Sequence, residues 1–122
     1  MMHRDIEHST QMACVRWFRY AYPDRLIFAI PNGGARSAVT GARLRDEGVT
    51  AGVPDLFICA AKGEFHGLFI EMKTPTGKLS AAQKQVAVQI VQEGYKFAVC
   101  RSFDEFRQIV TDYMRKADTG QI

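Results

Sequence analysis

Cysteines are few and long hydrophobic runs are missing from this chain. Three cysteines, Cys14, Cys59 and Cys100, are odd in number and widely spaced, so they form neither a CxxC metal clip nor a disulfide framework. We expect them to be reduced residues of the core. No apolar run approaches the roughly 18 to 20 residues that span a bilayer. These absences exclude a membrane partner and predict a soluble, cytoplasmic protein.

Low-complexity segments, internal repeats and a signal peptide are missing too. The chain opens on His3, Arg4 and Asp5, and not on an apolar signal core. Its 122 residues, 47% of them hydrophobic, fit one domain over 1–122, and we expect the tail after about residue 116 to fray. A net charge of +3 favours an anionic partner only slightly, because many basic proteins never bind nucleic acid.

Apolar periodicity and turn residues predict an alternation of helices and strands. In chain order we expect a helix over 5–20, a strand over 26–30, a helix over 37–47, hairpin strands over 56–60 and 68–72, a helix over 80–94, a strand over 96–100 and a helix from 102. Capping boxes, Ser80 with Gln83 and Ser102 with Glu105, begin the last two helices. The fold class is therefore α/β, with a mixed sheet flanked by helices on both faces.

Three ionisable residues stand at the ends of the two hairpin strands. Side chains alternate along a strand, so Glu71 and Lys73 point to one face. If the register places the even-numbered apolar residues on the opposite face, Asp55 joins them. This set of apolar residues is Leu56, Ile58, Leu68, Ile70 and Met72. Two carboxylates and one ammonium group then gather at one end of the sheet.

Two carboxylates so close repel each other, and a hard divalent cation such as Mg²⁺ relieves that repulsion. The chemistry that this predicts is metal-assisted hydrolysis of a phosphodiester, in which Lys73 orients the attacking water and stabilises the transition state. The alternative is structural: Glu71 and Lys73 form a surface ion pair, and Asp55 belongs to a Pro54-Asp55 turn.

The ordered motifs of the chain resemble the PD-(D/E)xK nuclease superfamily and, within it, the virus-type replication-repair nuclease (VRR-NUC) domain. The resemblance covers about residues 5 to 110. It rests on Ile30-Pro31-Asn32-Gly33-Gly34, Gly52-Val53-Pro54-Asp55-Leu56, Ile70-Glu71-Met72-Lys73, and Leu79-Ser80 followed by Gln83. It implies a restriction-endonuclease-like mixed sheet: an αβββαβ core, with an extra helix inserted after the first strand and a further helix at the C-terminus.

By position, the resemblance implies that Asp55 and Glu71 bind Mg²⁺ with the backbone carbonyl of Met72, and that Lys73 is the catalytic lysine. Mn²⁺ is expected to substitute for Mg²⁺. The resemblance also implies that Glu7, with Gln11 one turn later, faces the metal or its waters; an exposed helical Glu is the alternative. For Gln83, a capping role and a site role can coexist.

Five basic residues are candidates for phosphate contacts around the site. They are Arg36, Arg43, Arg45, Lys78 and Lys84. Each can equally be a solvated charge, and the turn chemistry of 32–34 already explains that loop. The resemblance implies DNA as partner, branched DNA such as four-way junctions or flaps as substrate, and a homodimer. The rival interpretation is a nucleic-acid-binding module that keeps the nuclease fold without cutting.

Overall fold

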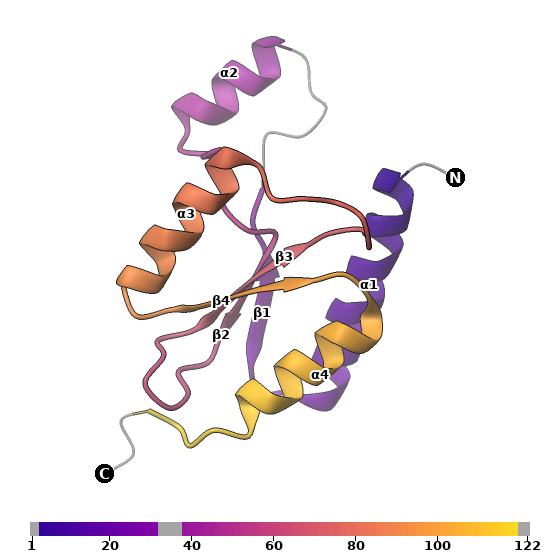
Figure 1. Cartoon of the computed structure of the whole chain (residues 1–122), viewed down its shortest axis with the longest axis vertical. Coiled ribbons are helices and arrows are strands. Elements are labelled where there is room, and N and C mark those ends of the chain that lie inside the picture. The colour runs from indigo at the N-terminus through magenta and orange to yellow at the C-terminus, as the bar shows by residue number, and fades with distance from the viewer. Residues whose placement is uncertain (1–2, 32–37, 120–122) are drawn as a thin grey trace.

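The computed structural model describes residues 3–31 and 38–119, and it confirms the predicted order of elements (Figure 1). These are α1 (His3–Ala21), β1 (Leu26–Ala29), α2 (Ala38–Asp46), β2 (Leu56–Cys59), β3 (Leu68–Met72), α3 (Ala81–Gln92), β4 (Lys96–Cys100) and α4 (Phe103–Met114). Within the described part of the chain, no helix combines the length and apolar character needed to cross a membrane.

The strands form one mixed sheet in the order β1-β2-β3-β4. β1 and β3 both run antiparallel to β2, whereas β4 is parallel to β3 and is reached through the crossover helix α3. In the hairpin, Leu56 pairs with Ile70 and Ile58 pairs with Leu68. All four of these even-numbered residues are fully buried, so the predicted register is confirmed.

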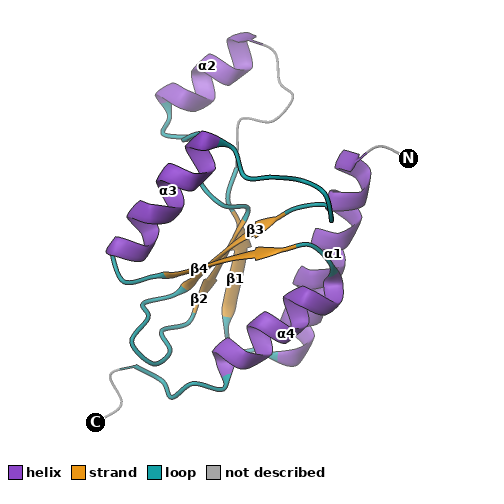
Figure 2. Cartoon of the chain, in the orientation of Figure 1, coloured by secondary structure: helices purple, strands orange, loops and turns teal. Residues whose placement is uncertain are grey.

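Helices cover both faces of the sheet, as the alternating pattern predicts (Figure 2). α1 and α4 pack on the face that carries the even-numbered hairpin residues, and Phe18, Phe106 and Val110 are fully buried there. The Tyr113 hydroxyl donates a 2.7 Å hydrogen bond to the carbonyl oxygen of Ala60, which joins α4 to the end of the hairpin strand. This side holds the main core.

The opposite face is lined by aromatic rings and is only partly covered. Phe57 packs against Phe28 and Phe69, with ring centroids 5.6 and 4.5 Å apart. α3 packs against β4, and none of its residues is buried. At the edge strand β1, Leu26 and Phe28 remain 57% and 42% exposed. This face therefore presents apolar side chains to solvent along β1.

Cys59 departs from the prediction that all three cysteines lie in the core. Cys14 and Cys100 are buried, but Cys59 is exposed. It pairs with Leu26 on the sheet face opposite α1 and α4. The thiol is exposed because α3 packs on the far strand, β4, and leaves this part of the face open.

The capping boxes of the last two helices differ in detail. At α3 both reciprocal hydrogen bonds are present, as predicted. At α4 the Ser102 hydroxyl accepts from the backbone N–H of Glu105, but the Glu105 carboxylate accepts from the backbone N–H of Arg101 at 2.9 Å. The predicted hydrogen bond from the backbone N–H of Ser102 to the Glu105 carboxylate is therefore wrong by one residue, since the donor is the residue before the cap.

Residues 117–119, in the tail that the sequence predicts to fray, contact the rest of the domain. Asp118 lies 2.7 Å from both the Arg25 guanidinium and the Lys62 ammonium group. Thr119 donates through its backbone N–H to Ala61 and through its hydroxyl to Gly63. The hairpin loop thus offers the tail polar partners that local sequence patterns do not reveal.

Candidate active site

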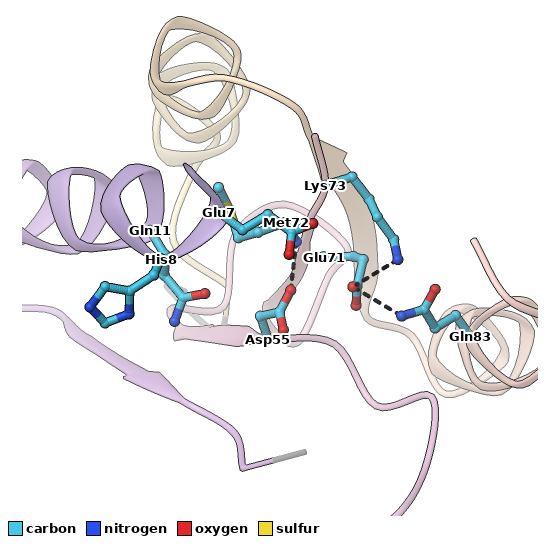
Figure 3. Close-up of a pocket in the computed structure, with 8 residues that line it drawn as sticks. All are labelled: Glu7, His8, Gln11, Asp55, Glu71, Met72, Lys73 and Gln83. Atoms are coloured by element: carbon cyan, nitrogen blue, oxygen red, sulfur yellow. Dashed lines mark hydrogen bonds and ion pairs between the residues drawn. The ribbon is translucent and has the colours of Figure 1, made fainter. Parts of the chain in front are cut away.

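A pocket of about 300 Å³ lies where the ends of β2 and β3 meet α1 and the beginning of α3 (Figure 3). It is lined by Glu7, His8, Gln11, Asp55, Glu71, Met72, Lys73 and Gln83. The structure therefore brings together the five side chains predicted for the site and the residue whose carbonyl was predicted as a ligand. It adds His8, which the sequence does not signal because neighbours along a helix point in different directions.

Asp55 is held at the beginning of β2 by hydrogen bonds from backbone N–H groups of the two neighbouring segments, one after β1 and one in β3. Continuing the register one residue beyond the pair of Leu56 and Ile70 places Asp55 across from Glu71. The Asp55 carboxylate accepts a 2.7 Å hydrogen bond from the backbone N–H of Met72, and its carbonyl accepts one from Ile30 at 2.8 Å. The carboxylate thus bridges to β3, which argues against a role confined to the turn.

Glu71 is a buried carboxylate surrounded by charged and polar groups. Its Oε2 lies 3.8 Å from Lys73 Nζ, and the two side chains are only 5% and 16% exposed. Burial and the nearby Asp55 charge raise the pKa of Glu71 to about 8, Lys73 opposes that shift, and Glu7 adds to it. The pair is not the surface ion pair of the structural alternative, and the charge of Glu7 acts on this site.

Gln83 serves the helix and the pocket with one side-chain amide. Its Oε1 accepts from the backbone N–H of Ser80 at 2.9 Å, and its Nε2 donates to Glu71 Oε2 at 3.1 Å. Its own backbone N–H donates to the Ser80 hydroxyl. The capping role and the contact with the site therefore coexist, and the beginning of α3 fixes the direction of the Glu71 carboxylate.

The donor groups suit a hard cation that keeps water ligands. Within 3–31 and 38–119, no group of three or more His, Cys, Asp or Glu side chains is arranged to hold a metal ion. Mg²⁺ instead binds through one or two carboxylates and retains waters. Asp55 and Glu71 supply those carboxylates. Burial and the nearby Asp55 charge disfavour the ionised form of Glu71, which a bound cation would favour.

Lys73 begins a segment that β4 and Arg101 hold in place. The backbone N–H of Lys73 donates to the carbonyl of Cys100 at 2.9 Å. The Arg101 guanidinium then donates to the carbonyls of Thr74 and Gly77 at 2.8 and 2.6 Å. These bonds limit the movement of the backbone that carries the lysine.

Four of the five basic residues predicted for phosphate contacts are described, and none of these four lines the pocket. Arg43 and Arg45 are exposed on α2, which lies beyond the sheet in Figure 1. Lys78 and Lys84 are exposed on either side of the beginning of α3. Arg36 and the loop at 32–34 lie outside the described residues. Composition alone could not separate these charges from solvated ones.

Gly52→Ala is expected to lower the free energy of unfolding by about 2 kcal/mol or more. Gly52 has φ +92°, and an added Cβ would lie 2.5 Å from the carbonyl oxygen of Ala82. This close approach joins the loop before Asp55 to the first turn of α3. Denaturant unfolding measures the loss.

Gly48→Ala is the matched control for that substitution. Gly48 also has positive φ, +106°, but nothing lies within 4 Å of its added Cβ. We expect the cost of backbone strain alone, about 1 kcal/mol. Equal losses in the two variants would contradict a special role for the contact between Gly52 and α3.

A mixed sheet between helices, with acidic residues and a lysine at the ends of its central strands, defines an α/β domain of the nuclease type. The profile of the VRR-NUC domain matches residues 2–104, and the chain belongs to this family. A solved structure described as a VRR_NUC domain protein is similar, with a TM-score of 0.76 and 27% identity over 92% of this chain and 90% of that one. No curated protein matches the chain.

Proposed function

We propose that this domain is a metal-dependent DNA endonuclease that hydrolyses phosphodiester bonds, with Mg²⁺ as cofactor and Mn²⁺ as a substitute. Asp55, Glu71 and the Met72 carbonyl would hold the metal ion. The observation that carries the proposal is the convergence of two carboxylates and Lys73 on one pocket, in which the charged form of Glu71 is strongly disfavoured. A buried carboxylate with a raised pKa, close to a second carboxylate and a lysine, is typical of a functional site.

A divalent ion bound there would polarise the scissile phosphate and lower the pKa of an attacking water. Lys73 would place its positive charge beside the phosphate and stabilise the charge that develops on it. Gln83 holds the Glu71 carboxylate through its 3.1 Å hydrogen bond. Glu7 adds a third carboxylate at the rim, where it would bind waters of the ion.

For the substrate we propose branched DNA, such as a four-way junction or a flap, and for the assembly a homodimer. Membership of the VRR-NUC family supports a nucleic-acid substrate. Symmetric cutting of a two-fold junction needs two centres, which a homodimer supplies. The exposed Leu26 and Phe28 on the unpaired edge of β1 offer an apolar surface for a second copy.

The test is a panel of single-stranded, duplex, flap and four-way junction DNA, incubated with Mg²⁺ or Mn²⁺. We expect cutting to depend on the metal, to be fastest on a branched substrate, and to be lost in Asp55→Ala. Wild type no more active than Asp55→Ala would favour the non-catalytic binding module. Sedimentation that shows only monomer, together with paired cuts in the junction, would contradict the homodimer.

A further inference from the structure

A second hollow adjoins the candidate active site on the surface of α1. It has a volume of about 240 Å³ and shares His8 and Gln11 with the first pocket. The rest of its lining is Met12, Val15, Arg16 and Arg19. The spacing of these positions, three and four residues apart, makes them one stripe along the helix. The two hollows are therefore neighbouring parts of one surface that leads away from the carboxylates.

The stripe is basic at the end that lies farther from the carboxylates. Arg16 and Arg19 are both exposed. Within 3–31 and 38–119, neither forms an ion pair with a carboxylate. Arg19 Nη2 lies 3.5 Å from the carbonyl oxygen of Ile27, so its guanidinium is turned toward β1 and leaves most of its donors free for an anion.

The geometry points to this stripe, which we name the α1 groove, as the binding surface for the sugar–phosphate backbone of the DNA strand beside the cut. The inference rests on the proposed nuclease function. Between His8 and Arg19 the helix rises about 16 Å, which corresponds to about five base-pair steps of 3.4 Å along the axis of a duplex. Arg16 and Arg19 would contact phosphates, whereas the half-exposed Met12 and neighbouring Val15 offer apolar contact to sugars.

The charges of the pocket explain why such a surface is needed. Three acidic side chains, Glu7, Asp55 and Glu71, line that pocket, and Lys73 supplies the single cation among its lining residues. Phosphates on either side of the cut must therefore find positive charge outside it. The α1 groove supplies two guanidinium groups in the hollow next to the pocket, whereas Arg43 and Arg45 on α2 line neither hollow.

The test measures DNA affinity in Ca²⁺, without turnover, by fluorescence anisotropy of a labelled four-way junction and a labelled duplex over 50 to 250 mM salt. For the double variant R16Q/R19Q we expect about tenfold weaker binding or more, and a salt slope smaller by about 1.8, which corresponds to two lost phosphate contacts. R16K/R19K should keep the slope. R107Q/R115Q removes two exposed arginines, one in α4 and one directly after it, as a matched control and should leave the affinity within twofold.

Arg16→Gln alone guards against a folding defect, because the Arg16 side chain bonds to no backbone group of the described residues, unlike that of Arg19. This variant should lower the slope by about 0.9. An unchanged slope in R16Q/R19Q, with wild-type cleavage intact, would overturn the α1 groove and leave the nuclease function standing. Salt-dependent binding that needs both arginines, without cleavage of any substrate, would support the groove and overturn the nuclease. Wild type that binds no DNA would overturn both.

Discussion

Lys73→Ala is expected to lower the single-turnover rate of DNA cleavage by about 10² to 10³ while leaving metal affinity at least as strong as in wild type. Lys73 Nζ lies 3.8 Å from Glu71 Oε2, so its charge competes with a cation for that carboxylate. Removing the ammonium group would leave the proposed metal ligands in place and remove only the charge that we propose acts on the phosphate. Calorimetric titration with Mn²⁺ and quenched-flow cleavage measure the two effects separately.

Asp55→Asn should differ from Lys73→Ala in metal binding, because it loses a proposed metal ligand and weakens both metal binding and cleavage. Lys116→Ala, which removes an exposed lysine near the hairpin, is the control and should change neither. If Lys73→Ala lost metal binding in parallel with cleavage, Lys73 would be a structural support of the carboxylates and not a group that acts on the phosphate.

The metal-free protein is expected to become less stable as the pH rises from about 5 to 8.5. The pKa of Glu71 is about 8 in the folded state against an ordinary 4.5, so the folded protein holds a proton there that the unfolded chain releases. The stabilisation is complete below pH 4.5 and is lost as the pH passes 8. We expect a loss of up to a few kcal/mol in urea unfolding with EDTA.

Mg²⁺ should counteract this loss most strongly at the alkaline end, because it binds the ionised carboxylate. Glu71→Gln, which cannot ionise, is the control and should flatten the slope in EDTA. The lowered pKa of Asp118 affects stability only below the pH range of this experiment. The buried thiols of Cys14 and Cys100, with pKa about 12, titrate above that range. If stability in EDTA changed with pH equally in the wild type and in Glu71→Gln, the raised pKa of Glu71 would be contradicted.

The sequence was sufficient to predict that the acidic site residues share one face of the sheet, because side chains alternate strictly along a strand. Placing Leu56 and Ile70 in the core was enough to set Asp55 and Glu71 on the opposite face. His8 could not be found in this way, since its place depends on how α1 crosses the strand ends. The anchoring of Asp118 by Lys62 likewise depends on two segments that meet only in the folded chain.

Arg16 and Arg19 illustrate a related limit. On the sequence they are two charges on an amphipathic helix, indistinguishable from Arg43 and Arg45 on another. Only the folded structure shows that the first pair adjoins the carboxylate pocket and the second does not. A count of basic residues predicts an anionic partner. To predict which surface that partner contacts, one must also know how α1 packs against β1.

Because Gln83 contacts both Ser80 and Glu71, opening of the first turn of α3 would also affect the candidate active site. One face of its amide closes the start of α3 on Ser80, and the other restrains Glu71. Opening of that first turn would release the carboxylate while the sheet and the α1 and α4 layer remain intact. We therefore expect cleavage activity to decline on warming before the domain as a whole unfolds, because the first turn of α3 opens at a lower temperature than the rest.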